Sequence, residues 1–206
     1  RQAWTPYANE TIYASVKPLP ARRAAIRLRA QQPVDTWAIN QLYNAAAPKP
    51  VQDAEAWTSH HWDLKSTKSV STPGDTTGWL LEEGHSLLGY ARITACGQAC
   101  LIELVYSPDR IDILPSLVDS TLELARLRSG RRVYCAVRGY QAELASSLED
   151  RGFLPGLEQD LLIKYTTATI RVPIMEAVPF QLEVGEKIPQ RVPTFLQGSS
   201  TDGASN

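Results

Sequence analysis

The sequence has few of the residues that mark secreted or membrane proteins. Its 206 residues include 3 Cys and 1 Met, and so low and odd a cysteine count does not suit a disulfide-built secreted scaffold. No apolar run approaches the roughly 18 residues that a membrane-spanning helix needs. The N-terminus starts at Arg1 without an apolar leader, and whether residues precede it stays open. We therefore predict a cytoplasmic protein without a membrane span.

The sequence also lacks an excess of charge of one sign. It contains 21 basic and 22 acidic residues, a net charge of -1, and this balance gives no reason to expect a nucleic-acid partner. The hydrophobic content of 43% is typical of a globular protein, whose length suits one domain plus additional chain. His60 and His61 are adjacent, but no Cys or carboxylate completes a ligand set at metal-binding spacing. We expect no metal site.

Both ends of the chain lack the periodicity of helices or strands. Residues 1–23 mix Pro, aromatic and polar residues, which predicts an extended N-terminal arm. In residues 169–206 an apolar residue precedes Pro four times, at Pro173, Pro179, Pro189 and Pro193. This pattern favours an extended or polyproline conformation. We predict that this Pro-rich tail binds a protein partner or a second copy of the chain, and that residues 24–168 form the folded domain.

Within residues 24–168 the hydrophobic periodicity alternates between that of strands and that of helices. A first strand is predicted at residues 24–30, and two helices follow at about 33–47 and 53–64. A meander of three antiparallel strands occupies residues 79–106. A long helix over 114–129, a strand at 132–137, a helix at 140–151 and a strand at 161–165 complete the order. The sequence therefore predicts an α+β domain.

The last helix ends in Leu148-Glu149-Asp150-Arg151-Gly152-Phe153. Gly152 suits the left-handed residue that follows a helix end, and Phe153 would fill the core behind it. This junction, together with the element order, resembles the GNAT superfamily of N-acetyltransferases over residues 24–167. The resemblance implies a mostly antiparallel central sheet of six to seven strands flanked by about four helices, with acetyl-coenzyme A as cofactor.

The expected cofactor loop departs from the family pattern. GNAT enzymes hold the pyrophosphate of coenzyme A on backbone amides of a glycine-rich loop before the long helix. Residues 107–116 contain no glycine, Pro115 lacks an amide proton, and Asp109 and Asp112 add negative charge. Only Arg110 resembles the basic residue of the family's loop. We predict a weakened or lost acetyl-coenzyme A site; if the cofactor binds, the backbone amides near Val105, Arg110 and Ile111 would hold it.

Two side chains are candidates for catalysis under the same resemblance. Glu103 matches the carboxylate that accepts a proton from the substrate amine, and burial would raise its pKa. Alternatively, Glu103 faces solvent or pairs with Arg92 across the meander. The tyrosine that protonates the departing thiolate in the family is replaced by Leu148, so Tyr140, or Tyr134, would have to substitute. The alternative for both tyrosines is ordinary packing.

The sequence leaves two functions open. The first is a GNAT-fold protein with a weakened or lost acetyl-coenzyme A site that acts as a binding or assembly subunit through its arm and tail. The second is an acetyl-coenzyme A-dependent N-acyltransferase with an atypical loop. Trp37, Trp57 and Trp62 lie in the region that walls the acceptor site in the family, where they would line a pocket or fill the core. The sequence names neither the acceptor nor the partner, and it leaves the oligomeric state open.

Overall fold

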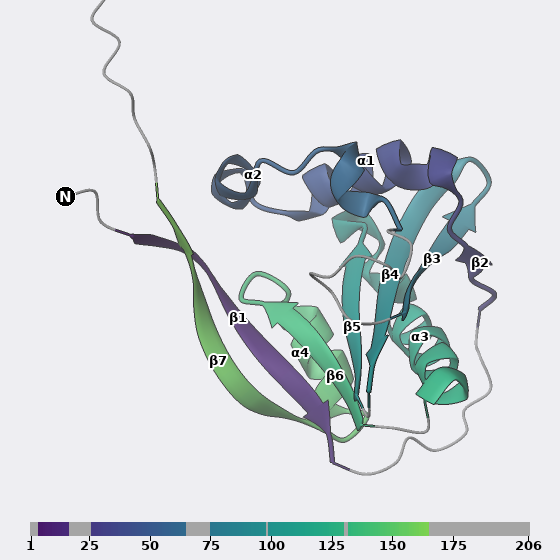
Figure 1. Ribbon diagram of the computed structural model, residues 1–206. Coiled ribbons are helices and arrows are strands. Elements are labelled where there is room, and N and C mark those ends of the chain that lie inside the picture. Colours follow the sequence, from purple (N-terminus) through teal and green to yellow (C-terminus); the bar gives the residue numbers. More distant parts are fainter. Residues whose placement is uncertain (1–3, 17–25, 65–74, 98, 130–131, 165–206) are drawn as a thin grey trace, which may run out of the picture. The chain divides into compact units, whose positions relative to one another are not determined.

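The computed structural model describes residues 4–16, 26–64, 75–97, 99–129 and 132–164 (Figure 1). These residues form a seven-stranded mixed sheet with four α-helices. This confirms the predicted α+β fold. The predicted tail at 169–206 lies outside the described residues.

The strands are joined in the order β2-β3-β4-β5-β6-β1-β7. Every neighbouring pair is antiparallel except β5 and β6, which run parallel. Their bounds are β1 Thr5–Ser15, β2 Arg29–Ala30, β3 Asp75–Glu83, β4 Ser86–Cys96, β5 Ala99–Tyr106, β6 Arg132–Arg138 and β7 Phe153–Ile163. The predicted meander corresponds to β3, β4 and β5.

The α-helices are α1 Thr36–Ala46, α2 Lys49–Glu55, α3 Leu114–Ser129 and α4 Ala142–Glu149, and the short 3-10 helices are η1 Pro33–Asp35, η2 Ser59–Trp62 and η3 Pro108–Ile113. The helix predicted at 53–64 is wrong. Pro50 is tolerated in the first turn of α2, and Ala56 ends that helix in a left-handed conformation with φ 47°. None of the described helices is both long and apolar enough to cross a bilayer.

The prediction of an arm over residues 1–23 is wrong for residues 5–15. They form β1, which lies between β6 and β7 in the sheet. Tyr13 is buried and its hydroxyl donates a hydrogen bond to Glu149 at 3.1 Å. Thr11, Ile12 and Tyr13 are residue types that favour strands, and Pro6 is tolerated because the ladder shifts register there. Of the strand predicted at 24–30, the described residues 26–30 contain only the two-residue strand β2.

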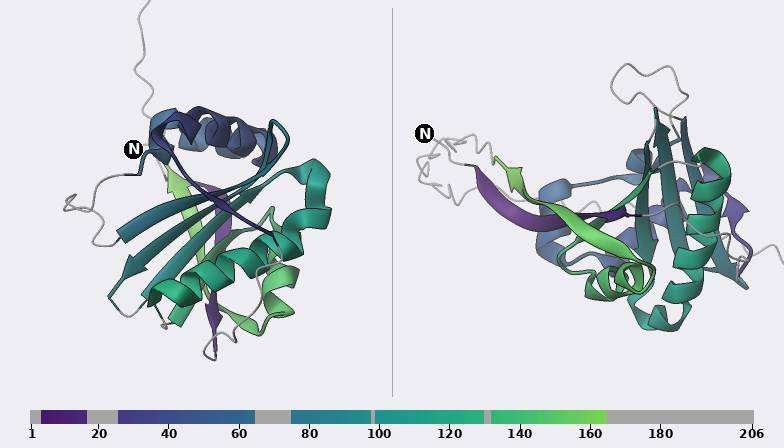
Figure 2. Two further views of the ribbon diagram at one scale, coloured as in Figure 1. Left: turned by 90° about the vertical axis from the view of Figure 1, so that its right-hand side faces the viewer. Right: turned by 90° about the horizontal axis from the view of Figure 1, so that it is seen from below.

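The sheet separates two groups of buried side chains. Cys100, Ile102 and Leu104 alternate along β5 and pack into the main core with α3 and α4, whereas Val105 packs on the other face with α1. Figure 2 shows α3 crossing the strands and β1 and β7 curving away as a pair. Glu103 lies two residues before Val105 in β5, so its side chain is on the same face of the sheet, the one that α1 covers.

The junction at the end of α4 has the predicted conformation. Gly152 has φ 80° and Phe153 is 0% exposed. The guanidinium of Arg151 donates to both carboxylate oxygens of Asp119, at 2.7 and 2.9 Å, and to the carbonyl of Pro115 at 2.9 Å. These hydrogen bonds connect the end of α4 to α3. This junction fixes the angle at which β7 leaves the helical layer.

Candidate functional site

Strands β5 and β6 pair at one end and separate at the other. The parallel ladder joins residues 99–102 to residues 132–135 and goes no further. Figure 1 shows the two strands diverging toward α1. Residues 103–106 and 136–138 therefore present the two sides of a cleft that opens beneath α1.

The side chain of Gln141 bridges this opening. Its Nε2 donates to the carbonyl of Leu104 at 3.0 Å, and its Oε1 accepts from the backbone N–H of Arg138 at 3.1 Å. The N–H of Ser107 bonds on the opposite side, to Leu88 of β4. Since successive backbone groups of a strand alternate in direction, Leu104 and Tyr106 face the cleft with their backbone, and Val105 faces β4. Gln141 therefore occupies one of the cleft-facing positions of β5.

A first cavity of about 50 Å³ lies in this cleft. Its charged lining consists of three carboxylates, Glu10, Glu55 and Glu103, and the guanidinium of Arg138. Its other lining residues are mostly aromatic or small: Tyr43, Ala46, Trp57, His61, Trp62, Leu104, Val105, Ala136, Tyr140 and Gln141. The cavity is thus acidic with an aromatic wall.

Arg138 is held between two of these carboxylates. Its Nε lies 2.9 Å from Glu10, which is directly opposite it in the β1–β6 register, and its Nη2 lies 3.0 Å from Glu55. The Glu55 side chain is 2% exposed and also accepts hydrogen bonds from Tyr43 at 2.5 Å and Tyr7 at 3.1 Å. Burial and the Glu55 carboxylate raise the pKa of both phenols, which therefore remain donors.

Glu103 is the most open of the three carboxylates, with 45% of its side chain exposed. Desolvation by the surrounding protein raises its pKa; Arg92 opposes that shift, and Glu10 adds to it. Arg92 lies opposite Glu103 in the β4–β5 register, but the two charged groups are 3.8 Å apart. The predicted pairing with Arg92 is therefore present but loose, and the carboxylate still lines the cavity.

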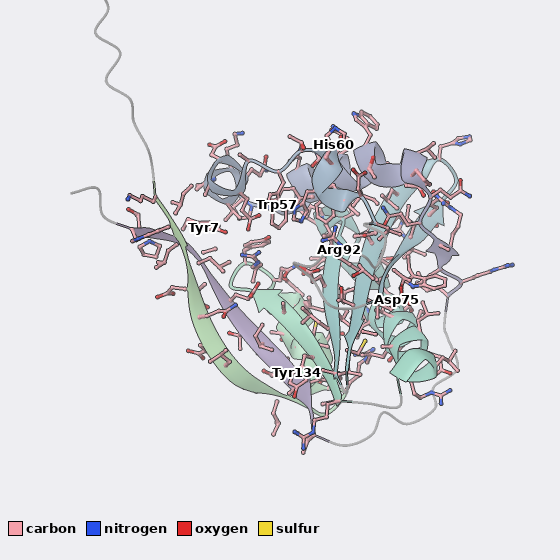
Figure 3. The ribbon with its side chains drawn as sticks, in the orientation of Figure 1. Tyr7, Trp57, His60, Asp75, Arg92 and Tyr134 are labelled. Carbon is pink, nitrogen blue, oxygen red and sulfur yellow. The ribbon has the colours of Figure 1, made fainter. Side chains whose placement is uncertain are left out.

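The aromatic wall is a stacked cluster. Trp57 lies on His61 with ring centroids 3.8 Å apart and 7° between the planes, and Arg92 lies 5.1 Å above the ring of Trp62. Figure 3 shows Trp57 and Arg92 on the α1 side of the sheet. Trp57 and Trp62 both line the cavity, and Trp62 is also part of the core. Trp37 is 65% exposed, so the expectation that it fills a pocket or the core is wrong.

A second cavity of about 170 Å³ lies between η3 and α4. It is lined by Ala46, Tyr106, Pro108, Ile111, Tyr140, Gln141 and Glu143, and it shares Ala46, Tyr140 and Gln141 with the first cavity. Burial raises the pKa of Tyr140 to about 12. Tyr134, the alternative to Tyr140, lies at the paired end of β5 and β6 (Figure 3). Leu148 is buried in the main core.

The residues before α3 form a short 3-10 helix with several internal contacts. Residues 108–113 form η3, in which the N–H of Arg110 bonds to Ser107 and the N–H of Leu114 bonds to Ile111. Pro108 and Pro115 have no amide proton. The guanidinium of Arg110 binds Glu83 and, at 3.0 Å, Asp112. Two backbone amides of this segment and its guanidinium are therefore engaged within the protein, and carboxylates stand beside them.

Solved structures with low sequence identity share this architecture. A GNAT-family protein from Novosphingobium aromaticivorans aligns with a TM-score of 0.58 at 16% identity, over 80% of this chain and 68% of its own. An acetyltransferase from the GNAT family of Colwellia psychrerythraea aligns with a TM-score of 0.53 at 11% identity, over 80% of this chain and 59% of its own. The chain has the GNAT fold.

A third solved structure that aligns with the chain is the N-myristoyltransferase of Saccharomyces cerevisiae with bound myristoyl-CoA. It aligns with a TM-score of 0.50 at 10% identity, over 77% of this chain and 48% of its own. The chain thus spans about half to two thirds of these three proteins. No protein-family model and no curated protein matches it.

The GNAT cleft brings together most of the residues predicted from the sequence. Glu103, Val105 and Tyr140 line the first cavity, and Ile111 and Tyr140 line the second. Arg110 lies instead in the ion pairs with Glu83 and Asp112. Among the described residues, no group of His, Cys, Asp or Glu is arranged to hold a metal ion.

Sequence reasoning missed Glu10, Glu55, Arg138 and Gln141. Glu10 was missed because its segment was assigned to an arm, although Thr11, Ile12 and Tyr13 are typical strand residues. Glu55 and Arg138 meet only because the fold brings the end of α2 within reach of the Arg138 side chain at the end of β6. The signal available for Arg138 was its position at the end of a strand, where the polar residues of a cleft often lie.

Proposed function

We propose that this GNAT-fold chain is a ligand-binding protein whose acetyl-coenzyme A site is weakened and whose first cavity binds an amine. The observation that carries the first half is Arg110 in η3: its amide bonds to Ser107, and its guanidinium pairs with Glu83 and Asp112. A diphosphate would have to displace Asp112 and Glu83 from Arg110 and would meet their negative charge.

The charge of the first cavity supports the second half. Glu10, Glu55 and Glu103 face Arg138, and Arg92 stands behind Glu103. Three carboxylates and two guanidinium groups leave one formal negative charge in a partly desolvated space. An ammonium group supplies the missing positive charge, and the ring of Trp57 adds a favourable cation–π surface.

Calorimetric titration with acetyl-coenzyme A tests the weakened site, with free coenzyme A as a control for the acyl group. We expect no saturation below about 1 mM, which corresponds to a binding free energy weaker than about -4 kcal/mol. Binding at micromolar concentration would overturn this half of the proposal. The Asp112→Asn variant, which loosens the hold on Arg110, is expected to bind more tightly than the wild type.

Tryptophan fluorescence tests the amine site, since Trp57 and Trp62 line the cavity. Propylamine is expected to change the emission with saturation, and propanol, which lacks the charge, is not. The Glu103→Gln variant should weaken propylamine binding about tenfold, because a charged hydrogen bond contributes roughly 1.5 kcal/mol. An equal response to the alcohol would refute a cation site.

A second candidate function is N-acyl transfer, favoured by Glu103. Its raised pKa suits proton acceptance from an amine in the cavity, and the phenol of Tyr140 stands at the boundary between the two cavities. The cleft-facing amide of Tyr106, rather than that of Val105, would then serve on β5. Release of free thiol from acetyl-coenzyme A with an amine, lost in Glu103→Gln, would support this candidate. No turnover at millimolar cofactor would eliminate it.

We also propose that the chain assembles with a protein partner or a second copy of itself through the Pro-rich tail. A cytoplasmic location is a separate proposal. Residues 5–15 belong to the sheet, so the tail alone carries the assembly hypothesis. Deletion of residues 171–206 should reduce the number of chains per particle, taken as the light-scattering mass divided by the mass of one chain, and in this test an unchanged mass means an unchanged number of chains. An unchanged mass and unchanged partner capture would refute it.

A further inference from the structure

The sheet has an unpaired edge at β2, which hydrogen-bonds only to β3 among the described strands. The N–H of Gln31 donates to the carbonyl of Gly78 at 2.9 Å and continues the β2–β3 register. Backbone groups alternate in direction along an antiparallel strand, so Arg29 also faces β3, and Leu28 and Ala30 face away from the sheet. Arg29 Nη1 donates to the carbonyl of Ala30 at 3.1 Å. The N–H and C=O of Leu28 and the N–H of Ala30 have no hydrogen-bond partner within the described part of the chain.

This edge is held in place from both ends. The N–H of Ile26 donates to the hydroxyl of Ser120 in α3 at 3.3 Å, and that hydroxyl donates to the carbonyl of Ile26 at 2.9 Å. The guanidinium of Arg29 donates to both carboxylate oxygens of Asp35 at 2.9 and 3.0 Å, and to Glu82 at 2.9 Å. A strand that pairs with β2 would therefore meet a backbone that is already ordered, which reduces the entropic cost of binding.

A third cavity, of about 470 Å³, lies along this edge. It shares no lining residue with the two cavities of the cleft, since its lining is Arg27, Leu28, Arg29, Ala30, Trp79, Leu80 and Glu82. Leu28 and Trp79 are half-buried against the main core, on the side of the sheet that α3 covers. The cavity thus combines unpaired backbone groups with an apolar surface on the α3 side, which is the combination that an added strand uses.

The charges of the lining select the kind of strand. Arg29 and Glu82 form an ion pair, whereas Arg27 is exposed and has no ion pair within the described residues. A second copy of β2 that paired antiparallel, with Leu28 opposite Leu28 or Ala30 of the copy, would place arginines directly opposite each other. Like charges in opposite positions are destabilising. The edge therefore suits a different segment, with an acidic residue opposite Arg27.

Exposed apolar side chains flank the same edge. Val34 in η1 is 79% exposed and Trp37 in α1 is 65% exposed. Asp35 lies between them in sequence and binds Arg29, so this corner of η1 and α1 adjoins β2 (Figure 1). Tryptophan and arginine are the residue types that most often dominate protein–protein binding energy. Their presence beside the cavity favours a polypeptide partner, which can reach beyond the cavity, over a small molecule.

We propose that the β2 edge binds an extended segment of another protein, which adds to the sheet as an antiparallel strand. An apolar residue of that segment lies opposite Leu28, exchanges two backbone hydrogen bonds with it and packs beside Trp79. The next residue of the segment is acidic and lies opposite Arg27, on the other face of the sheet. This interaction is independent of the proposed function, because it uses no residue of the cleft.

Fluorescence anisotropy of a labelled peptide, Val-Thr-Leu-Glu-Val with a C-terminal amide, tests the backbone pairing on the full chain. Its Leu is designed to lie opposite Leu28 and its Glu opposite Arg27. We expect saturation with a dissociation constant below about 1 mM. N-methylation of the peptide Leu removes the N–H that pairs with Leu28 and should weaken binding at least tenfold. N-methylation of the peptide Glu, whose N–H points away from β2, should change it less than about twofold. No saturation, or equal losses with the two methylated peptides, would overturn the proposal.

The acidic preference has its own test. Replacing the peptide Glu by Gln, and Arg27→Gln in the protein, should each weaken binding about threefold, as expected for an exposed ion pair. The two changes together should weaken it no further, because both remove one interaction. Arg132→Gln is the matched control, since it removes one exposed positive charge from β6, and it should leave the affinity unchanged. Full affinity in Arg27→Gln, or an equal loss in Arg132→Gln, would contradict recognition of an acidic residue at Arg27.

Discussion

Replacing Glu55 with Gln should destabilise the protein more than any exposed ion-pair change. The Glu55 side chain is 2% exposed and accepts from Arg138, Tyr43 and Tyr7. Gln keeps the shape but removes the charge, and its amide N–H₂ would face donors. Removing one partner of a buried ion pair costs about 3–5 kcal/mol. Because Arg138 retains Glu10 at 2.9 Å, we expect a smaller loss than this, about 2–3 kcal/mol.

The measurement is urea unfolding of wild type and variant, with the free energy taken from a two-state fit. Glu83→Gln is the matched control: Glu83 also pairs with an arginine, Arg110, but its side chain is 66% exposed. An exposed pair contributes roughly 0–1 kcal/mol, so this variant should stay close to wild type. Tyr43→Phe alone should cost about 1 kcal/mol. Combined with Glu55→Gln it should cost less than the sum, because both act on one hydrogen bond.

The reasoning is refuted if Glu55→Gln and Glu83→Gln lose the same free energy. Equality would mean that the buried network contributes no more than a solvated ion pair. It would also remove the physical basis for treating Arg138 as a fixed positive charge at the cavity, since that fixation depends on Glu55.

Three further predictions concern pH and the glycines. The pKa of Glu103 is raised above 4.5 in the folded state, so the folded protein retains a proton that the unfolded chain releases; the contribution of Glu103 to stability should fall as pH rises above about 4.5. The urea midpoint of Glu103→Gln should therefore rise relative to that of the wild type between pH 4 and 7. A difference between the two midpoints that stays constant over this range would contradict the raised pKa of Glu103. Gly152 has φ 80°, so Gly152→Ala should reduce the free energy of unfolding in urea by about 1–2 kcal/mol. Gly139→Ala should be near neutral, because the added Cβ would lie 3.6 Å from its nearest neighbour. Equal losses in the two variants would refute the backbone strain inferred at position 152. Gly89→Ala would place a Cβ 2.8 Å from Leu117 and should reduce the free energy of unfolding by about 1–3 kcal/mol, which is measured as a lower thermal midpoint. An unchanged midpoint would show that α3 shifts to make room for the methyl group.

The parts of the fold that sequence predicted are those with strong local signals. Gly152 and Phe153 follow from the chemistry of a helix end, and both are as expected. The meander follows from period-two hydrophobicity interrupted by Gly84 and Gly97, which have φ 62° and 52°. These features are local, so a single sequence contains the information needed to find them.

The errors occurred where tertiary contacts decide the structure. β1 carries Pro6, Asn9 and Glu10, a composition that favours a loop when taken alone. In the sheet, Glu10 is satisfied by Arg138 on one side and Gln159 on the other. A charged residue in a central strand is stable only because two distant strands supply its partners, and no local pattern contains that information.

The candidate site has the same division between local and distant information. Glu103 and Tyr140 were found because a resemblance gave their positions a meaning, and both line the first cavity. Arg138 acquires its meaning only from Glu10 and Glu55, which precede it by more than 80 residues. The two carboxylates hold the guanidinium in place through Nε and Nη2. Ligand selectivity in this cleft is therefore a property of the assembled fold.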